Sequence, residues 1–194
     1  MPSRSGVSGR ESAEVGFSLI ELLIYMVLAV VVLLVVGSLL INSLTAERTV
    51  RDAAQSSSTG QLVSKSVGQG VRNSSSIWRS PAGAVPQVLI VRTAGTASTE
   101  SWFCQAWSFQ NGQIRSTSSP DLIPTTTANI ATWTLIGDGM APVAGFPVFG
   151  GSGRTVVLKL DVDSGKGQPL RIETSLHSRQ PVPATGVEVS LPCF

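Results

Sequence analysis

The sequence predicts an α+β protein in which one long N-terminal helix is followed by antiparallel β-strands. Residues 22–41 form an apolar run that only Tyr25, Gly37 and Ser38 interrupt, and no proline lies between Pro2 and Pro81 to break a helix. Beyond Pro81, short alternating apolar segments are separated by turn-forming residues, which is typical of antiparallel strands.

The composition excludes several classes of function. Of the 194 residues, 42% are hydrophobic and 13% are charged, and 14 basic against 12 acidic residues give a net charge of +2. A nucleic-acid-binding protein has a broad basic surface, so direct binding of nucleic acid is not expected. The single histidine, His177, and two cysteines leave few groups for metal ligation or nucleophilic catalysis. We therefore expect no catalytic residue, no metal site, no cofactor and no enzymatic activity.

The apolar run from Leu22 to Ile41 contains twenty residues and no charged side chain. At about 1.5 Å per residue, such a helix spans about 30 Å, the thickness of a bilayer core. A secretory signal peptide has a shorter apolar region and a small-residue cleavage site, which residues 42–46 match poorly. The run predicts a single membrane-spanning helix, and cleavage behind it is the alternative. Arginines flank the run on both sides, so the positive-inside rule does not set its orientation.

Glu21 places a carboxylate at the very start of the apolar run. An ionised side chain inside a membrane costs about 2.5–3.5 kcal/mol on insertion scales, so such a residue usually has a partner or a function. No basic residue lies between Arg10 and Arg48. Two interpretations stay open: Glu21 lies at the level of the lipid headgroups, or it pairs with a cation that the sequence as written does not contain.

The helix is expected to continue beyond the apolar run, with an amphipathic half over residues 42–76. Glu47 and Arg51 are four residues apart with the acid first, a spacing that favours helix. Glycines weaken the segment, and we expect an end or a bend between Gly68 and Ser76. A flexible Ser/Gly linker over residues 56–76 is the alternative.

Residues 77–194 are expected to form the β domain. The clearest pattern is a hairpin around residues 164–167, because alternate residues from Val156 to Val162 are apolar and its partner strand puts His177 on the polar face. A second hairpin joins residues 101–109 to residues 113–117 through Asn111-Gly112, a favoured two-residue turn. Further strands are expected over residues 87–92 and 132–136.

The residues around Glu21 carry a resemblance to a known family. The segment Gly16-Phe17-Ser18-Leu19-Ile20-Glu21 resembles the processing site of type IV pilins and type II secretion pseudopilins. The resemblance implies that residues 1–16 are a leader peptide, which a prepilin peptidase removes by cutting between Gly16 and Phe17. It also implies that the new amine of Phe17 is methylated, and that Glu21 pairs with the Phe17 amine of a neighbouring subunit in a fibre.

The resemblance further implies the organisation of the chain and its partners. Residues 17–41 would form the transmembrane and fibre-core helix, and the continuing helix would pack on the antiparallel sheet of an extracytoplasmic β domain in a pilin-like fold. The partners would be the membrane, the prepilin peptidase, other pilin or pseudopilin subunits and the assembly platform protein. The order of helix and hairpins resembles the larger minor pilins and the J-type minor pseudopilins. The alternative is a single-pass anchored binding domain that never polymerises.

The two cysteines, Cys104 and Cys193, form the simplest disulfide framework in an exported domain. A bridge between them would tie the C-terminal tail, residues 181–194, to the sheet. Two buried free thiols are the alternative.

A weaker motif covers residues 161–165, which resemble the opening of a calcium-binding loop. The twelfth position of such a loop needs a bidentate Glu, and Ile172 stands there instead. We therefore interpret this segment as the end of a strand followed by a turn.

Overall fold

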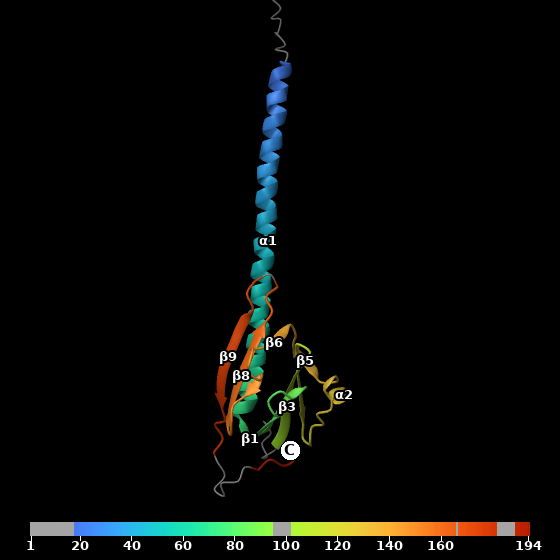
Figure 1. The fold of residues 1–194 in the computed structure, drawn as a ribbon, viewed down its shortest axis with the longest axis vertical. Coiled ribbons are helices and arrows are strands. Elements are labelled where there is room, and N and C mark those ends of the chain that lie inside the picture. The colour runs from blue at the N-terminus through green and yellow to red at the C-terminus, as the bar shows by residue number, and fades with distance from the viewer. Residues whose placement is uncertain (1–17, 95–101, 166, 182–188) are drawn as a thin grey trace, which may run out of the picture. The chain divides into compact units, whose positions relative to one another are not determined.

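The computed structural model describes residues 18–94, 102–165, 167–181 and 189–194 (Figure 1). The chain divides into two compact units, Met1–Ala46 and Glu47–Phe194, which are treated separately below. The predicted α+β class is confirmed: one long N-terminal helix is followed by antiparallel strands, and its C-terminal half packs on them.

The helix α1 covers Leu19–Arg72 and has 54 residues. Within the first unit, the side chains from Leu22 to Val36 are all exposed, and the apolar window of the helix has no buried residue. By length and composition, this helix can cross a membrane.

Within the second unit, α1 presents a narrow apolar face to the β-strands. Val63, Val67 and Val71 recur every four residues along this face and are fully buried. The linker alternative is wrong for residues 56–72, which are helical. The helix ends at Arg72, inside the predicted window, but the predicted continuation to residue 76 is too long because Ser74 already begins a strand.

In the part of the chain that the structure describes, nine strands form two antiparallel sheets, β1 to β5 in the first and β6 to β9 in the second. The first sheet has the order β1 (Ser74–Arg79), β2 (Gln87–Ala94), β3 (Trp102–Gln110), β4 (Gln113–Ser119) and β5 (Thr134–Gly137). In the second, β8 (Thr155–Val162) pairs with β6 (Met140–Pro142), β7 (Phe149–Gly150) and β9 (Leu170–His177). A short helix, α2 (Thr127–Ile130), lies between β4 and β5 in the chain.

Two hydrophobic cores lie on opposite faces of the first sheet, because the side chains of β3 alternate. Trp107 points into the larger core, which α1 shares with both sheets. Cys104 and Ala106 point into the smaller core, which Ile130 of α2 and the tail residue Cys193 complete. Figure 1 shows β8 and β9 running beside the lower part of α1, in agreement with the residues of the larger core.

The predicted hairpins are confirmed. Asn111 and Gly112 join β3 to β4 with positive φ angles of 50° and 74°, as a tight Asn-Gly turn requires. In the other hairpin, alternate residues of β8 from Val156 to Val162 are buried, and His177 is exposed on β9. The sequence did not predict β1, β6, β7 or α2, whose residues are too few or too polar to form an apolar alternation.

Candidate functional site

The first candidate site is the N-terminal end of α1. Glu21 lies in the first turn of the helix, where its negative carboxylate interacts favourably with the positive end of the helix dipole. It is partly buried, whereas the residues that follow it are exposed. The predicted cleavage position between Gly16 and Phe17 lies outside the described residues.

Glu21 has a partner that the sequence analysis did not identify. The phenolic O–H of Tyr25 donates to Glu21 Oε1 at 3.0 Å. Tyr25 is one helical turn beyond Glu21, so the i,i+4 spacing was the signal that could have revealed the pair. A carboxylate accepts up to about four hydrogen bonds, and one phenol therefore leaves capacity for further donors such as an ammonium.

Two hydroxyl side chains within or just after the apolar run donate to carbonyl groups of the helix itself. Ser38 Oγ donates to the carbonyl of Val35 at 2.8 Å, and Thr45 Oγ1 donates to the carbonyl of Ile41 at 2.9 Å. Such bonds to the preceding turn let hydroxyl groups lie in an apolar medium at low cost. The helix surface from Leu22 to Ile41 is therefore compatible with lipid or with other apolar helices.

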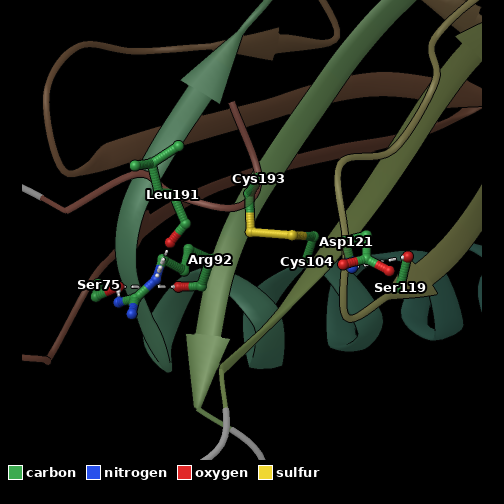
Figure 2. The surroundings of a disulfide bond; sticks show 7 residues. All are labelled: Ser75, Arg92, Cys104, Ser119, Asp121, Leu191 and Cys193. Atoms are coloured by element: carbon green, nitrogen blue, oxygen red, sulfur yellow. Dashed lines mark hydrogen bonds between the residues drawn. A yellow bond between two sulfur atoms is a disulfide. The ribbon is translucent and has the colours of Figure 1, made fainter.

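The second candidate feature is the attachment of the C-terminal tail. Cys104 of β3 and Cys193 form a disulfide with a Cα–Cα distance of 5.3 Å, and both cysteines are fully buried. The predicted pairing is thus present, and the free-thiol alternative is wrong (Figure 2). The bridge links residues 89 positions apart and fixes the tail to the face of the sheet that lies away from α1.

Arg92 makes a second attachment beside the disulfide. It lies opposite Cys104 in the β2–β3 register. Its Nε donates to the carbonyl of Leu191 at 2.8 Å and its Nη1 to Ser75 Oγ at 2.9 Å (Figure 2). Its guanidinium also lies 3.9 Å from the centroid of the Trp102 ring, in cation–π geometry. Partial burial lowers the pKa of Arg92 from its usual value.

The segment that resembled a calcium loop is the end of β8 and the turn after it. Asp161 accepts from Arg171 Nε at 2.9 Å, and Asp163 Oδ1 accepts from the backbone N–H of Gly165 at 2.9 Å. The Arg171 hydrogen bond lowers the pKa of Asp161. Among the residues that the structure describes, no group of three His, Cys, Asp or Glu side chains is arranged to hold a metal ion.

A scan against protein-family models finds no model that matches this chain, and searches of curated proteins and of solved structures find no match either.

Proposed function

We propose that this chain is a structural subunit, a minor pilin or pseudopilin, of a type IV pilus or a type II secretion-like fibre. The observation that carries the proposal is the segment from Gly16 to Glu21, followed at once by a helix with an exposed apolar surface. The segment matches the processing site of prepilins at each position, from the glycine before the cut to the glutamate five residues after it.

In this proposal, processing creates the cation that the sequence lacks. Cleavage after Gly16 leaves an ammonium at Phe17, which the prepilin peptidase then methylates. In the fibre, Glu21 of one subunit pairs with the Phe17 amine of its neighbour. Each charge is costly in an apolar medium when it is alone, and the two satisfy one another only in the polymer.

The hydrogen bond from Tyr25 supports this role for Glu21. Before assembly, the phenol gives the carboxylate one donor inside the same subunit. Because the carboxylate can accept further bonds, an incoming amine need not displace the phenol. Glu21 then recruits and registers subunits, while the apolar helix surface serves first as a membrane anchor and later as the fibre core.

The proposal is tested by assembly of variants in the native host. We expect Glu21→Ala and Glu21→Gln to be cleaved normally but to be depleted from fibres sheared off the cells, as measured by immunoblot of the sheared and membrane fractions. Glu47→Ala is the matched control, because Glu47 forms an exposed ion pair with Arg51 at 2.6 Å outside the apolar run. Normal incorporation of both Glu21 variants would contradict the pairing, and exclusion of the wild-type chain from fibres would favour the single-pass anchored domain.

A further inference from the structure

Two opposite ends of the second unit carry opposite charges. At one end, α1 finishes at Arg72, and the backbone N–H of Arg179, just beyond β9, donates to the Arg72 carbonyl at 2.9 Å. At the other end, Ser56 Oγ of α1 donates to the carbonyl of Asp163, the residue after β8, at 2.5 Å. At about 1.5 Å per residue, the stretch of α1 from Asp52 to Arg72 is about 30 Å long. The two ends are therefore separate surfaces.

The first surface, which we call the basic end, consists of Arg72, Arg79, Arg154 and Arg179. Hydrogen bonds hold these four residues together. Arg179 is bonded to Arg72 through the backbone, and Arg154 Nη2 donates to Oγ of Ser178, the residue before Arg179, at 2.6 Å. Arg79 Nη2 donates to the carbonyl of the residue before Arg154, at 2.9 Å. Four arginines from α1, β1 and the two ends of the β8–β9 pair therefore meet at one end of the unit.

Two guanidinium groups of the basic end are available to a partner. Arg79 and Arg154 are partly buried and donate to carbonyl or hydroxyl oxygens of neighbouring loops, so they have a structural role. Arg72 and Arg179 are exposed, and no hydrogen bond or ion pair within the described residues involves either guanidinium group. The negative end of the α1 dipole stabilises Arg72, which lies in the last turn. Arg179, beyond the strands, has no such internal explanation.

The second surface, which we call the acidic pocket, is an open pocket of about 270 Å³ lined by Asp52, Asp138 and Asp163. They come from α1, from the turn between β5 and β6, and from the turn after β8. All three are exposed, and none forms an ion pair with a described residue. Asp163 Oδ1 accepts from the backbone N–H of Gly165 at 2.9 Å, which leaves most of the acceptor capacity of the three carboxylates unused.

Cations of the same chain that lie close in sequence do not neutralise the acidic pocket. Arg51 is paired with Glu47 at 2.6 Å, and Arg171 is paired with Asp161 at 2.9 Å. Arg48 lies one helical turn before Asp52, but no ion pair joins them. A cation from outside the chain is therefore the natural complement of these carboxylates. A guanidinium group suits them, because it binds carboxylates through two parallel hydrogen bonds.

We propose that the basic end of one copy of this chain docks on the acidic pocket of a second copy, with Arg72 and Arg179 facing the three aspartates. Both halves of the complementary pair belong to the same chain, which argues for a second copy as the partner. Each surface repels its own kind, so a symmetric contact between identical surfaces is disfavoured. A head-to-tail contact leaves one unsatisfied surface at each end and can repeat, as in open filaments. The inference goes beyond the proposed function and does not depend on cleavage after Gly16.

Zero-length cross-linking with a carbodiimide tests the contact. Arg179→Lys keeps the positive charge and adds an amine that couples to a carboxylate in contact with it. The reaction is run on the full chain extracted in detergent and on fibres sheared from the native host, and mass spectrometry locates the links. Because the two ends of one copy are about 30 Å apart, a link from position 179 to the acidic pocket joins two copies. We expect such links, and none from Lys65, which is exposed on α1 between the two ends.

A second substitution shows whether charge drives the contact. In the Arg179→Lys chain, Asp138→Asn should lower the yield of links to the other two aspartates by about 1.4- to 5-fold, the equivalent of one exposed ion pair. Asp121→Asn is the matched control, because Asp121 is exposed outside the acidic pocket. Raising the salt from 0.1 to 1 M should also lower the yield, since it shortens the screening length from about 10 Å to about 3 Å.

The outcomes separate this inference from the fibre function. Links in the extracted chain, with no copy of the chain in the fibres, would support the docking and contradict the fibre function. Fibres that contain the chain but give no link from position 179 to the acidic pocket, with none in the extracted chain either, would overturn the docking alone. Links from position 179 only to carboxylates of another protein would also overturn it. An unfolding temperature equal to that of the wild type shows that each variant is folded.

Discussion

Tyr25 Oη lies 3.0 Å from Glu21 Oε1, one helical turn away at the start of the apolar run. The bond joins the ionisable Glu21, on a helix long enough to span a membrane, to the neutral phenol of Tyr25 on the same chain. Hydrogen bonds to charged groups contribute about 1.5–3 kcal/mol, comparable to the cost of placing the carboxylate in an apolar medium. The pair gives the Glu21 carboxylate a donor within its own chain.

Replacing Tyr25 with Phe removes only the hydroxyl group. We expect the infrared carboxyl band of Glu21, identified by its disappearance in Glu21→Gln, to shift in Tyr25→Phe because its oxygen loses a donor. Ser38→Ala is the control, since it removes a helix hydroxyl that bonds Val35 instead. An unchanged band in Tyr25→Phe would show that the phenol does not contact the carboxylate.

Two glycines of α1 should respond oppositely to the same substitution. A Cβ at Gly70 would overlap with Trp107 Cη2 and lie 2.9 Å from Gln105 Oε1, whereas at Gly68 its nearest neighbour is Leu176 Cδ2 at 3.4 Å. We expect Gly70→Ala to lower the free energy of unfolding by about 1–3 kcal/mol through overpacking.

Gly68→Ala, in contrast, should leave the free energy of unfolding unchanged or raise it by up to about 1 kcal/mol, because alanine favours helix. Urea unfolding of the full chain in detergent, followed by tryptophan fluorescence, compares the two variants. Equal stabilities would mean that α1 does not approach Trp107 closely at Gly70.

The Cys104–Cys193 bridge should contribute strongly to stability because it closes a long loop. For a sequence separation of 89 residues, loss of the bridge in the double variant Cys104→Ala/Cys193→Ala should lower the free energy of unfolding by about 2–5 kcal/mol. Urea unfolding measures this loss. Alkylation of the unfolded wild-type protein should label no cysteine before reduction and both after it, and labelling before reduction would contradict the bridge.

The Asp161–Arg171 pair should make stability depend on pH at the acid end. The Arg171 hydrogen bond lowers the pKa of Asp161 in the folded protein. The stabilisation by this ion pair is therefore complete above a pH of about 3.9, the pKa of an aspartate in the unfolded chain. It is lost as the pH falls through the lower pKa that Asp161 has in the folded protein. The free energy of unfolding of Asp161→Asn, measured against pH, should show a shallower acid dependence than that of the wild type. Equal slopes for Asp161→Asn and the wild type would contradict the effect.

Regular periodicity explains which strands the sequence could predict. Alternate residues of β8 are apolar, a pattern that requires one buried face of the strand. The structure buries all four of these residues, Val156, Leu158, Leu160 and Val162. By contrast, Ser74–Arg79 has no apolar alternation, and it becomes a strand because its backbone pairs with β2. Local patterns do not encode such pairing.

Apart from the Cys104–Cys193 bridge, contacts between distant residues were beyond sequence reasoning for a similar physical reason. The attachment of Leu191 to Arg92 depends on tertiary packing of segments 99 residues apart. The Glu21–Tyr25 pair was within reach, because both residues lie on one helical turn.

We propose that this chain is processed as a prepilin, and the N-terminus of the mature protein decides whether it is. The protein is extracted from membranes of its native host and analysed by N-terminal sequencing and intact mass. We expect the mature chain to start at Phe17 and to carry one additional methyl group on its α-amine. A mature chain that retains residues 1–16 would contradict it.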